Sequence, residues 1–247
     1  DEIRVEKEEN QIIIRAGRSK AGLVFEQEVR LPIDEEIGKI GKWKKLPDNF
    51  TDAIRFCYPC CSKDMSRPVL TCVSVFDQEV LASDSYQIVR HTLNSKIPGD
   101  GFLIPASSVH DLVRYGVKEF SEGMGWVHFR TEDDTIFSAR VYNEEFPDVG
   151  GHLRIKGIDF SFPKNIKEIL DRAYIFAKKE IISGDMPTVE IEIKDGRVFI
   201  SSENEHGWFK EQARTRYSGD PVGFVIGVEF LINIFNKLKS CIIGEGK

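Results

Sequence analysis

The sequence predicts an α+β protein built from duplicated domains, each with two helices packed on antiparallel sheets. Two distant segments share one pattern, because residues 101–105 (GFLIP) and 223–227 (GFVIG) are both strand-like and both lead into apolar residues at helical spacing. The two copies lie a constant 122 residues apart, from Phe102 to Phe224 and from Ile104 to Ile226. Solenoid repeats are only about 20 to 50 residues long, so this spacing indicates a duplicated domain.

The composition is that of an ordinary globular chain. Its 247 residues suffice for two domains of ordinary size, and 41% hydrophobic residues with 17 Phe suffice for their cores. The net charge of -6 argues against a surface coated with basic residues, although a local basic stripe remains compatible with it. We find no apolar run of about 18 residues and no signal peptide, and we expect a cytoplasmic protein.

Residues 1–40 resemble the end of a domain. The segments 3–5, 12–14 and 23–25 are strand-like, with no helix to cover them. Three strands alone are marginally stable, so we expect them to be the C-terminal part of a first domain. The chain begins at Asp1, which indicates a piece of a longer protein, and the Gly- and Lys-rich segment 37–45 marks a boundary.

The middle domain is expected at residues 41–153. Its first helix is amphipathic over residues 50–61, with Asp48, Asn49 or Thr51 as its N-cap and Pro59 predicted to kink or end it. We then expect, in order, strands at 70–76, 80–92 and 102–104, a helix from Ser107 to Gly116, and strands at 126–130 and 135–142.

The last domain is expected at residues 154–247 and repeats this order. A strand at 160–162 precedes a helix at 166–177, with Pro163 placed in the first helical turn. Lys194-Asp195-Gly196 predicts a hairpin turn. The remaining expected elements are strands at 189–193, 197–202, 212–217 and 223–226 and a helix at 228–238. The middle-domain pattern calls for two more strands after Lys239, so we expect the C-terminal strands to be missing.

The five cysteines are an odd number, which does not fit a closed disulfide framework. Cys57, Cys60 and Cys61 raise the possibility of zinc, but a second ligand pair is missing. At helical spacing these residues are better interpreted as small buried thiols, and we expect no metal and no cofactor.

Several segments, in their order, resemble the bacterial or phage-encoded DNA polymerase III beta sliding clamp, a processivity factor. They are residues 15–20 (RAGRSK), 66–71 (SRPVLT), 81–88 (LASDSYQI), 102–105 (FLIP), 137–140 (FSAR) and 145–148 (EFPD). The resemblance implies the DNA-clamp fold, a head-to-tail homodimeric ring around double-stranded DNA, and no catalysis. It also implies that DNA polymerase, the clamp loader and other replication and repair proteins bind through short linear peptides.

The resemblance implies that basic residues on or beside the helices face DNA, where they would contact phosphates without regard to sequence. The alternative is that these side chains form an ordinary solvated helix face. Ala106 and Ser107 stand where the family often has basic residues, which argues against tight contact there. The candidates are Arg55, Lys63, Arg67, Arg114, Lys164, Lys167, Arg172, Lys178, Lys179, Lys237 and Lys239.

The family binds partner peptides in an apolar pocket between its second and third domains. Leu70 and Ile88 could instead belong to the core, and residues 85–87 (SYQ) differ from the family's Gly-His-Arg, which implies another peptide preference. Carried over by position, the pocket residues are Leu70, Ser83, Ser85, Tyr86, Gln87, Ile88 and Pro147.

Two other functions are weighed against the clamp. One is a clamp-like scaffold or binding module that does not encircle DNA. The other is a hydrolase with Cys57, His110 and Asp111 as nucleophile, base and acid, although nothing in the sequence brings them together. The pair Trp208-Phe209 is interpreted either as a partner contact or as local core.

Overall fold

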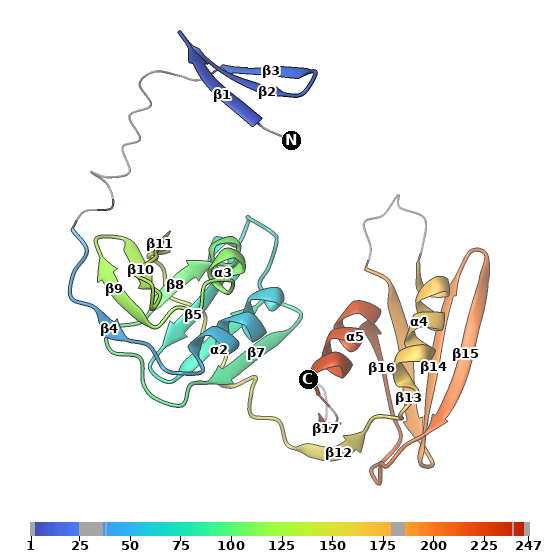
Figure 1. Cartoon of the computed structure of the whole chain (residues 1–247). Coiled ribbons are helices and arrows are strands. Elements are labelled where there is room, and N and C mark those ends of the chain that lie inside the picture. The colour runs from blue at the N-terminus through green and yellow to red at the C-terminus, as the bar shows by residue number, and fades with distance from the viewer. Residues whose placement is uncertain (1–2, 25–36, 38, 179–185, 239, 245–247) are drawn as a thin grey trace. The chain divides into compact units, whose positions relative to one another are not determined.

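The computed structural model describes residues 3–24, 37, 39–178, 186–238 and 240–244 (Figure 1). The chain divides into two compact units. Unit 1 consists of Asp1–Ser85 and Val89–Phe146, and unit 2 consists of Tyr86–Ile88 and Pro147–Lys247. Near the N-terminus, the three strand-like segments form a separate antiparallel sheet with the strand order β1-β2-β3. Its strands are β1 (Ile3–Glu8), β2 (Gln11–Ala16) and β3 (Ser19–Val24).

The two units repeat one topology, which confirms the predicted duplication. Unit 1 contains a four-stranded sheet of order β7-β6-β5-β8, and unit 2 contains one of order β15-β14-β13-β16. In each unit a strand before the first helix pairs with the strand after the second helix, β4 with β9 and β12 with β17. Unit 1 has β4 (Lys44–Lys45), α2 (Phe50–Cys57), β5 (Cys72–Phe76), β6 (Glu79–Ser83), β7 (Ile88–Thr92), β8 (Phe102–Pro105), α3 (Ala106–Leu112), β9 (Glu119–Gly123), β10 (Trp126–Arg130) and β11 (Ile136–Arg140). Unit 2 has β12 (Gly157–Ser161), α4 (Ile166–Ala177), β13 (Thr188–Lys194), β14 (Arg197–Asn204), β15 (Gly207–Arg214), β16 (Val222–Gly227), α5 (Val228–Lys237) and β17 (Ser240–Gly244).

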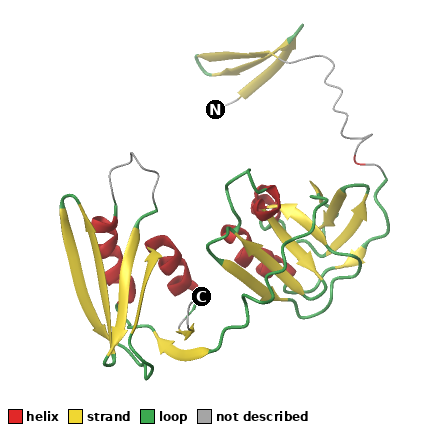
Figure 2. Cartoon of the chain, turned by 180° about the vertical axis from the view of Figure 1, so that it is seen from behind, coloured by secondary structure: helices red, strands yellow, loops and turns green. Residues whose placement is uncertain are grey.

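Each core lies between the helices and one face of a four-stranded sheet (Figure 2). In unit 1 the core also includes Phe120, Val127 and Phe129 of a second sheet, of order β11-β10-β9-β4. In unit 2, α4 buries Ile169, Leu170 and Ala173, which recur at helical spacing. They pack in one cluster with alternate residues of β13, among them Ile191 and Ile193. Among the described residues of unit 2, no helix covers the opposite face of this sheet (Figure 2).

The hairpin between β13 and β14 forms as predicted. Its two turn residues, Asp195 and Gly196, have φ of 51° and 67°. Positive φ at both central positions is the type I′ geometry that the Asp-Gly pair favours.

Other expected elements are corrected in unit 1. The first helix ends at Cys57 and continues as a 3-10 turn, Tyr58–Cys60, because Pro59 cannot extend the α-helical hydrogen bonding. Leu70 belongs to a second 3-10 turn, Pro68–Thr71, and not to a strand. The expected strand 80–92 is two strands, because the chain bends between β6 and β7 where Ser85 has φ of 77°.

The helix N-termini also differ from the prediction. Asn49 is the N-cap of α2 but makes no side-chain cap bond. Its side chain instead donates to the Thr92 carbonyl at 3.1 Å and accepts from the Asn94 amide at 3.0 Å, so it joins α2 to the loop after β7. Helix α3 is shorter than expected, and Pro163 precedes α4, whose N-cap is Asn165. The sequence pattern predicts neither β4 nor β9. It also leads us to expect that the strands after Lys239 are missing, but β17 is present there and pairs with β12.

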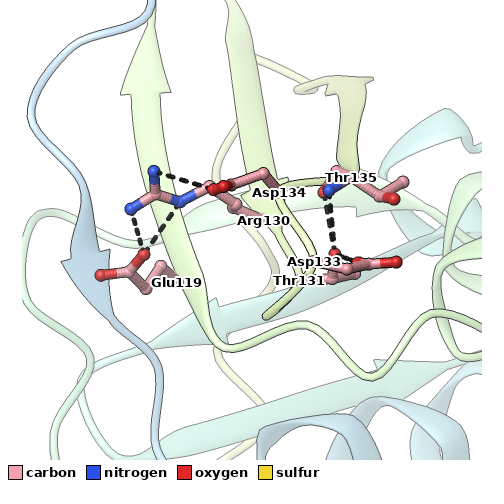
Figure 3. A network of polar contacts seen from close by, with 6 residues as sticks. All are labelled: Glu119, Arg130, Thr131, Asp133, Asp134 and Thr135. Carbon is pink, nitrogen blue, oxygen red and sulfur yellow. Dashed lines mark hydrogen bonds and ion pairs between the residues drawn. The ribbon is translucent and has the colours of Figure 1, made fainter.

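The hairpin of β10 and β11 carries a polar network (Figure 3). The Arg130 guanidinium donates to Glu119 across the strands, with Nε to Oε2 at 2.9 Å, and lies 3.5 Å from Asp134. The turn is closed by Thr131 and Thr135, whose backbone amides donate to the Thr135 carbonyl at 3.1 Å and to Thr131 Oγ1 at 3.0 Å. The network fixes this edge of unit 1.

A polar row runs through the same sheet at His128. Its Nδ1 lies 2.8 Å from Ser138 Oγ, while its cross-strand neighbour on the other side is Ser121. His128 and Ser121 are both fully buried, and within the described residues neither His128 Nε2 nor Ser121 Oγ has a hydrogen-bond partner. Burial lowers the pKa of the His128 imidazole, because desolvation disfavours its charged form.

Candidate nucleic-acid interface

Helix α4 presents a mixed-charge face to solvent. Lys167, Glu168, Asp171 and Arg172 are exposed on it, and Ile175 is 65% exposed. The periodicity that buries Ile169 and Ala173 forces these residues outward. The face therefore carries cations and anions in equal number.

The Arg172 guanidinium is already paired. It donates to Glu211 on β15 through Nε at 3.0 Å and through Nη2 at 2.8 Å to each carboxylate oxygen. A two-pronged arginine–carboxylate contact holds both groups in a fixed geometry. Arg172 is one of the α4 residues that the sequence predicts to contact DNA, and the Glu211 carboxylate offsets its charge.

Lys164 and Lys167 differ from Arg172. Both are exposed, Lys164 in the turn before α4 and Lys167 in its first turn. Just beyond the end of the helix, the ammonium of Lys178 lies 4.6 Å from the centre of the Tyr174 ring, a cation–π distance. Lys179 and Lys239 lie outside the described residues.

The arginines of unit 1 bind other groups of the protein. Arg55 donates to Asp52 at 2.7 Å and to the Val113 carbonyl at 3.1 Å, so it ties α2 to the end of α3. Of the remaining candidates, Arg114 lies 3.2 Å from His110 Nε2, Arg67 donates to Ser85 Oγ at 3.0 Å, and Lys63 and Lys237 are exposed.

The residues carried over for the peptide pocket differ in exposure. Leu70 and Ser83 are buried, at 8% and 4% exposed, while Tyr86 is 80% exposed. Ser85 holds positive φ and accepts from Arg67. Gln87 and Ile88 are half-buried, and Pro147 is exposed in the loop that follows β11.

The cysteine-hydrolase alternative finds no support in this geometry. Cys57 is fully buried, and its thiol donates to the Val80 carbonyl at 3.5 Å. His110 instead lies against Tyr58, with Nδ1 3.5 Å from the hydroxyl. Burial raises the pKa of the Cys61 and Cys72 thiols, which keeps them protonated.

No arrangement of three or more metal-ligating side chains occurs among the described residues. Likewise, no described helix combines the length and apolar character needed to cross a bilayer.

The sequence alone did not identify Glu211, the carboxylate that pairs with Arg172. It lies 39 residues from Arg172 along the chain. The alternation along β15 turns Phe209, Glu211 and Ala213 toward the helices, and this alternation is the signal that could have found it.

The comparisons with known proteins address the fold. No family model and no curated protein matches the chain. Among solved structures it is similar to DNA polymerase III subunit beta from Pseudomonas aeruginosa, with 17% identity and a TM-score of 0.75 over 96% of this chain and 68% of that chain. It is similar to the DNA polymerase III beta chain from Streptococcus pneumoniae, with 22% identity and a TM-score of 0.76 over 96% and 67%. A sliding clamp from Bartonella birtlesii bound to griselimycin matches with 15% identity and a TM-score of 0.74 over 96% and 68%. The chain therefore has the α+β fold of bacterial sliding clamps and spans about two-thirds of their length.

Proposed function

We propose that this protein is a non-enzymatic sliding clamp, a processivity factor that encircles double-stranded DNA in the cytoplasm. The observation that carries the proposal is the duplicated topology, which matches solved clamps over 96% of the chain. A topological tether needs only weak, sequence-independent phosphate contacts. A protein with net charge -6 and a few exposed lysines beside its helices meets that need.

The proposed ring is a head-to-tail homodimer, and β15 is a suitable edge for it. Within the described residues, this eight-residue strand pairs only with β14. An edge strand of this length presents unpaired backbone donors and acceptors to another strand. We therefore propose that a second subunit pairs along β15.

The proposed clamp holds DNA polymerase and the clamp loader through short linear peptides. Tyr86 and Ile88 would supply apolar contact, and Ser85 and Gln87 would orient the peptide. Leu70, Ser83 and Pro147 complete the proposed pocket. Since residues 85–87 (SYQ) replace the family's Gly-His-Arg, the proposed peptide preference differs from that of the family.

The mixed charge of α4 favours a second candidate, a clamp-like scaffold that does not encircle DNA. Glu168 and Asp171 flank Lys167, and Arg172 is paired with Glu211. These carboxylates oppose the approach of phosphate. The scaffold would bind peptides without binding DNA.

Fluorescence anisotropy with a labelled duplex of about 30 base pairs separates the two candidates. The clamp is expected to bind two duplexes of unrelated sequence equally, with affinity that falls steeply as salt rises. A labelled peptide containing Gln and Leu or Phe, compared between wild type and Ile88→Ala, tests the tether. Peptide binding without duplex binding at low salt and without retention on circular DNA would contradict the clamp and support the scaffold.

A further inference from the structure

The strand β15 turns two adjacent aromatic residues to opposite faces of its sheet. Phe209 stacks on Phe176 of α4, with ring centres 6.3 Å apart, and belongs to the core side. Trp208 lies on the other face and is 68% exposed. Exposed tryptophans are costly to hydrate, and they are enriched among residues that dominate binding energy.

Trp208 lines a cavity of about 670 Å³ on unit 2, which we call the Trp208 groove. Its volume lies within the range of about 300 to 1,000 Å³ typical of ligand sites. Apolar contact is offered by Trp208, Val225 and Met186, and Val225 is 66% exposed. Polar groups come from Glu190, Glu203 and Ser201.

The charges of the groove favour a cation. Glu203 lies directly across from Trp208 in the β14–β15 register. Within the described part of the chain, Glu203 has no basic partner, and Glu190 accepts a hydrogen bond from Ser201 Oγ at 3.2 Å. Two carboxylates beside the electron-rich face of an indole attract an ammonium or guanidinium group.

Lys210 lies beyond Ser201 in the neighbouring cross-strand row and is the basic side chain that lines this groove. The described lining therefore has two carboxylates and one ammonium group. A polyanion such as nucleic acid would meet repulsion from both carboxylates. A peptide can place its cation near the carboxylates and a backbone carbonyl near Lys210.

We propose that the Trp208 groove binds a segment of a partner protein that carries an arginine or lysine beside an aliphatic residue. The cation lies over Trp208 between Glu203 and Glu190, and the aliphatic side chain packs on Val225 and Met186. Trp208, Glu203 and Glu190 lie on the sheet face that points away from the core, and Ala177 at the end of α4 also lines the groove. The proposed contacts do not use the lysines proposed to contact DNA. The inference does not depend on the clamp function.

The probes are two fluorescein-labelled pentapeptides, Gly-Leu-Arg-Leu-Gly and Gly-Leu-Glu-Leu-Gly, both blocked at their ends. We expect the arginine peptide to bind more tightly than the glutamate peptide by anisotropy. Trp208→Ala should weaken it at least about tenfold, because truncating a central interface tryptophan typically costs more than about 1.4 kcal/mol. Trp208→Phe should give an intermediate affinity.

Paired carboxylate variants test the charge argument. Glu203→Gln combined with Glu190→Gln should weaken the arginine peptide and flatten its salt dependence. Glu168→Gln, on the α4 face, is the matched control and should leave its affinity unchanged. Circular dichroism confirms that each variant is folded.

Three results would overturn the proposal. They are equal affinity for the two peptides, no effect of Trp208→Ala on the arginine peptide, and no binding of that peptide at millimolar concentration. Competition of the arginine peptide by oligo(dT) at this groove would assign it to nucleobases instead. If the protein binds the arginine peptide but does not bind duplex DNA, the clamp proposal is contradicted and the Trp208 groove proposal is not.

Discussion

Loss of positive charge should affect DNA binding differently at two basic residues of α4 that lie five positions apart. Lys167→Gln and Arg172→Gln each remove one positive charge from the same exposed helix face. Lys167 is exposed in the first turn, whereas Arg172 is held by Glu211 at 2.8 Å. If α4 faces DNA, Lys167 is available to a phosphate and Arg172 is committed to its carboxylate.

The expected size follows from counterion release. Each phosphate neutralised contributes about 0.9 to the slope of log affinity against log salt. Lys167→Gln should therefore reduce the slope by about 0.9, and the double variant with Lys164→Gln by about 1.8. For Arg172→Gln we expect a slope change close to zero. Arg172→Gln also removes the ion pair with Glu211, and because that pair is partly exposed, its loss should cost at most about 1 kcal/mol of stability.

The measurement is anisotropy of the labelled duplex at several NaCl concentrations between about 50 and 200 mM, the range in which such slopes are usually resolved. Wild type, the two single variants and the lysine double variant are compared, with thermal unfolding to confirm their folds. An equal slope reduction for Arg172→Gln and Lys167→Gln would refute the distinction drawn from the ion pair. A slope unchanged in the lysine double variant would remove α4 from the DNA interface.

Three further predictions concern unit 1. Burial lowers the pKa of His128, so below about pH 6.5 the unfolded chain binds a proton there that the folded chain does not. As the pH falls below this value, the free energy of unfolding should therefore decrease by at most about 1.4 kcal/mol per pH unit. Urea unfolding of wild type and His128→Gln between about pH 7.5 and 5.5 checks this, and an equal pH dependence in both would contradict it. Glu119→Gln should cost about 1 kcal/mol by loosening its guanidinium partner, while Asp134→Asn, 83% exposed, should be neutral in the same unfolding measurement. Gly101→Ala should lower the free energy of unfolding by about 2 kcal/mol or more, because Gly101 has φ of 77° and a new Cβ would lie 2.4 Å from a backbone oxygen. Gly116→Ala is the control and should be tolerated, because a Cβ at Gly116 would have open space around it.

The sequence could predict the elements whose patterns are local. Helix α4 begins and ends where its apolar spacing indicates, and the Asp195-Gly196 turn forms where its φ preference requires. Strands such as β4, with two residues, carry no periodicity and form because a neighbour offers hydrogen bonds. The break between β6 and β7 depends on a positive φ at Ser85, which a serine in the sequence does not predict. Local pattern alone could not predict either feature.

The candidate interface was less predictable than the fold, for a related reason. The sequence shows that a residue is basic and on a helix, but not which carboxylate the fold brings beside it. Glu211 meets Arg172 only once β15 packs against α4. The same packing decides that Phe209 faces the core and Trp208 faces solvent. A pairing between residues 39 positions apart therefore distinguishes Arg172 from the exposed lysines beside it on α4.

This separation bears on how the proposed clamp would stay on DNA. If only a few lysines are available, the total salt slope is only about 0.9 for each, and direct affinity at physiological salt is weak. A weakly attracted protein dissociates quickly from linear DNA unless the DNA threads a closed ring. The proposed clamp should therefore persist on circular DNA and leave when that DNA is cut, with little change in affinity. Retention that survives linearisation would mean that tight local contacts hold the protein and that the ring mechanism is wrong.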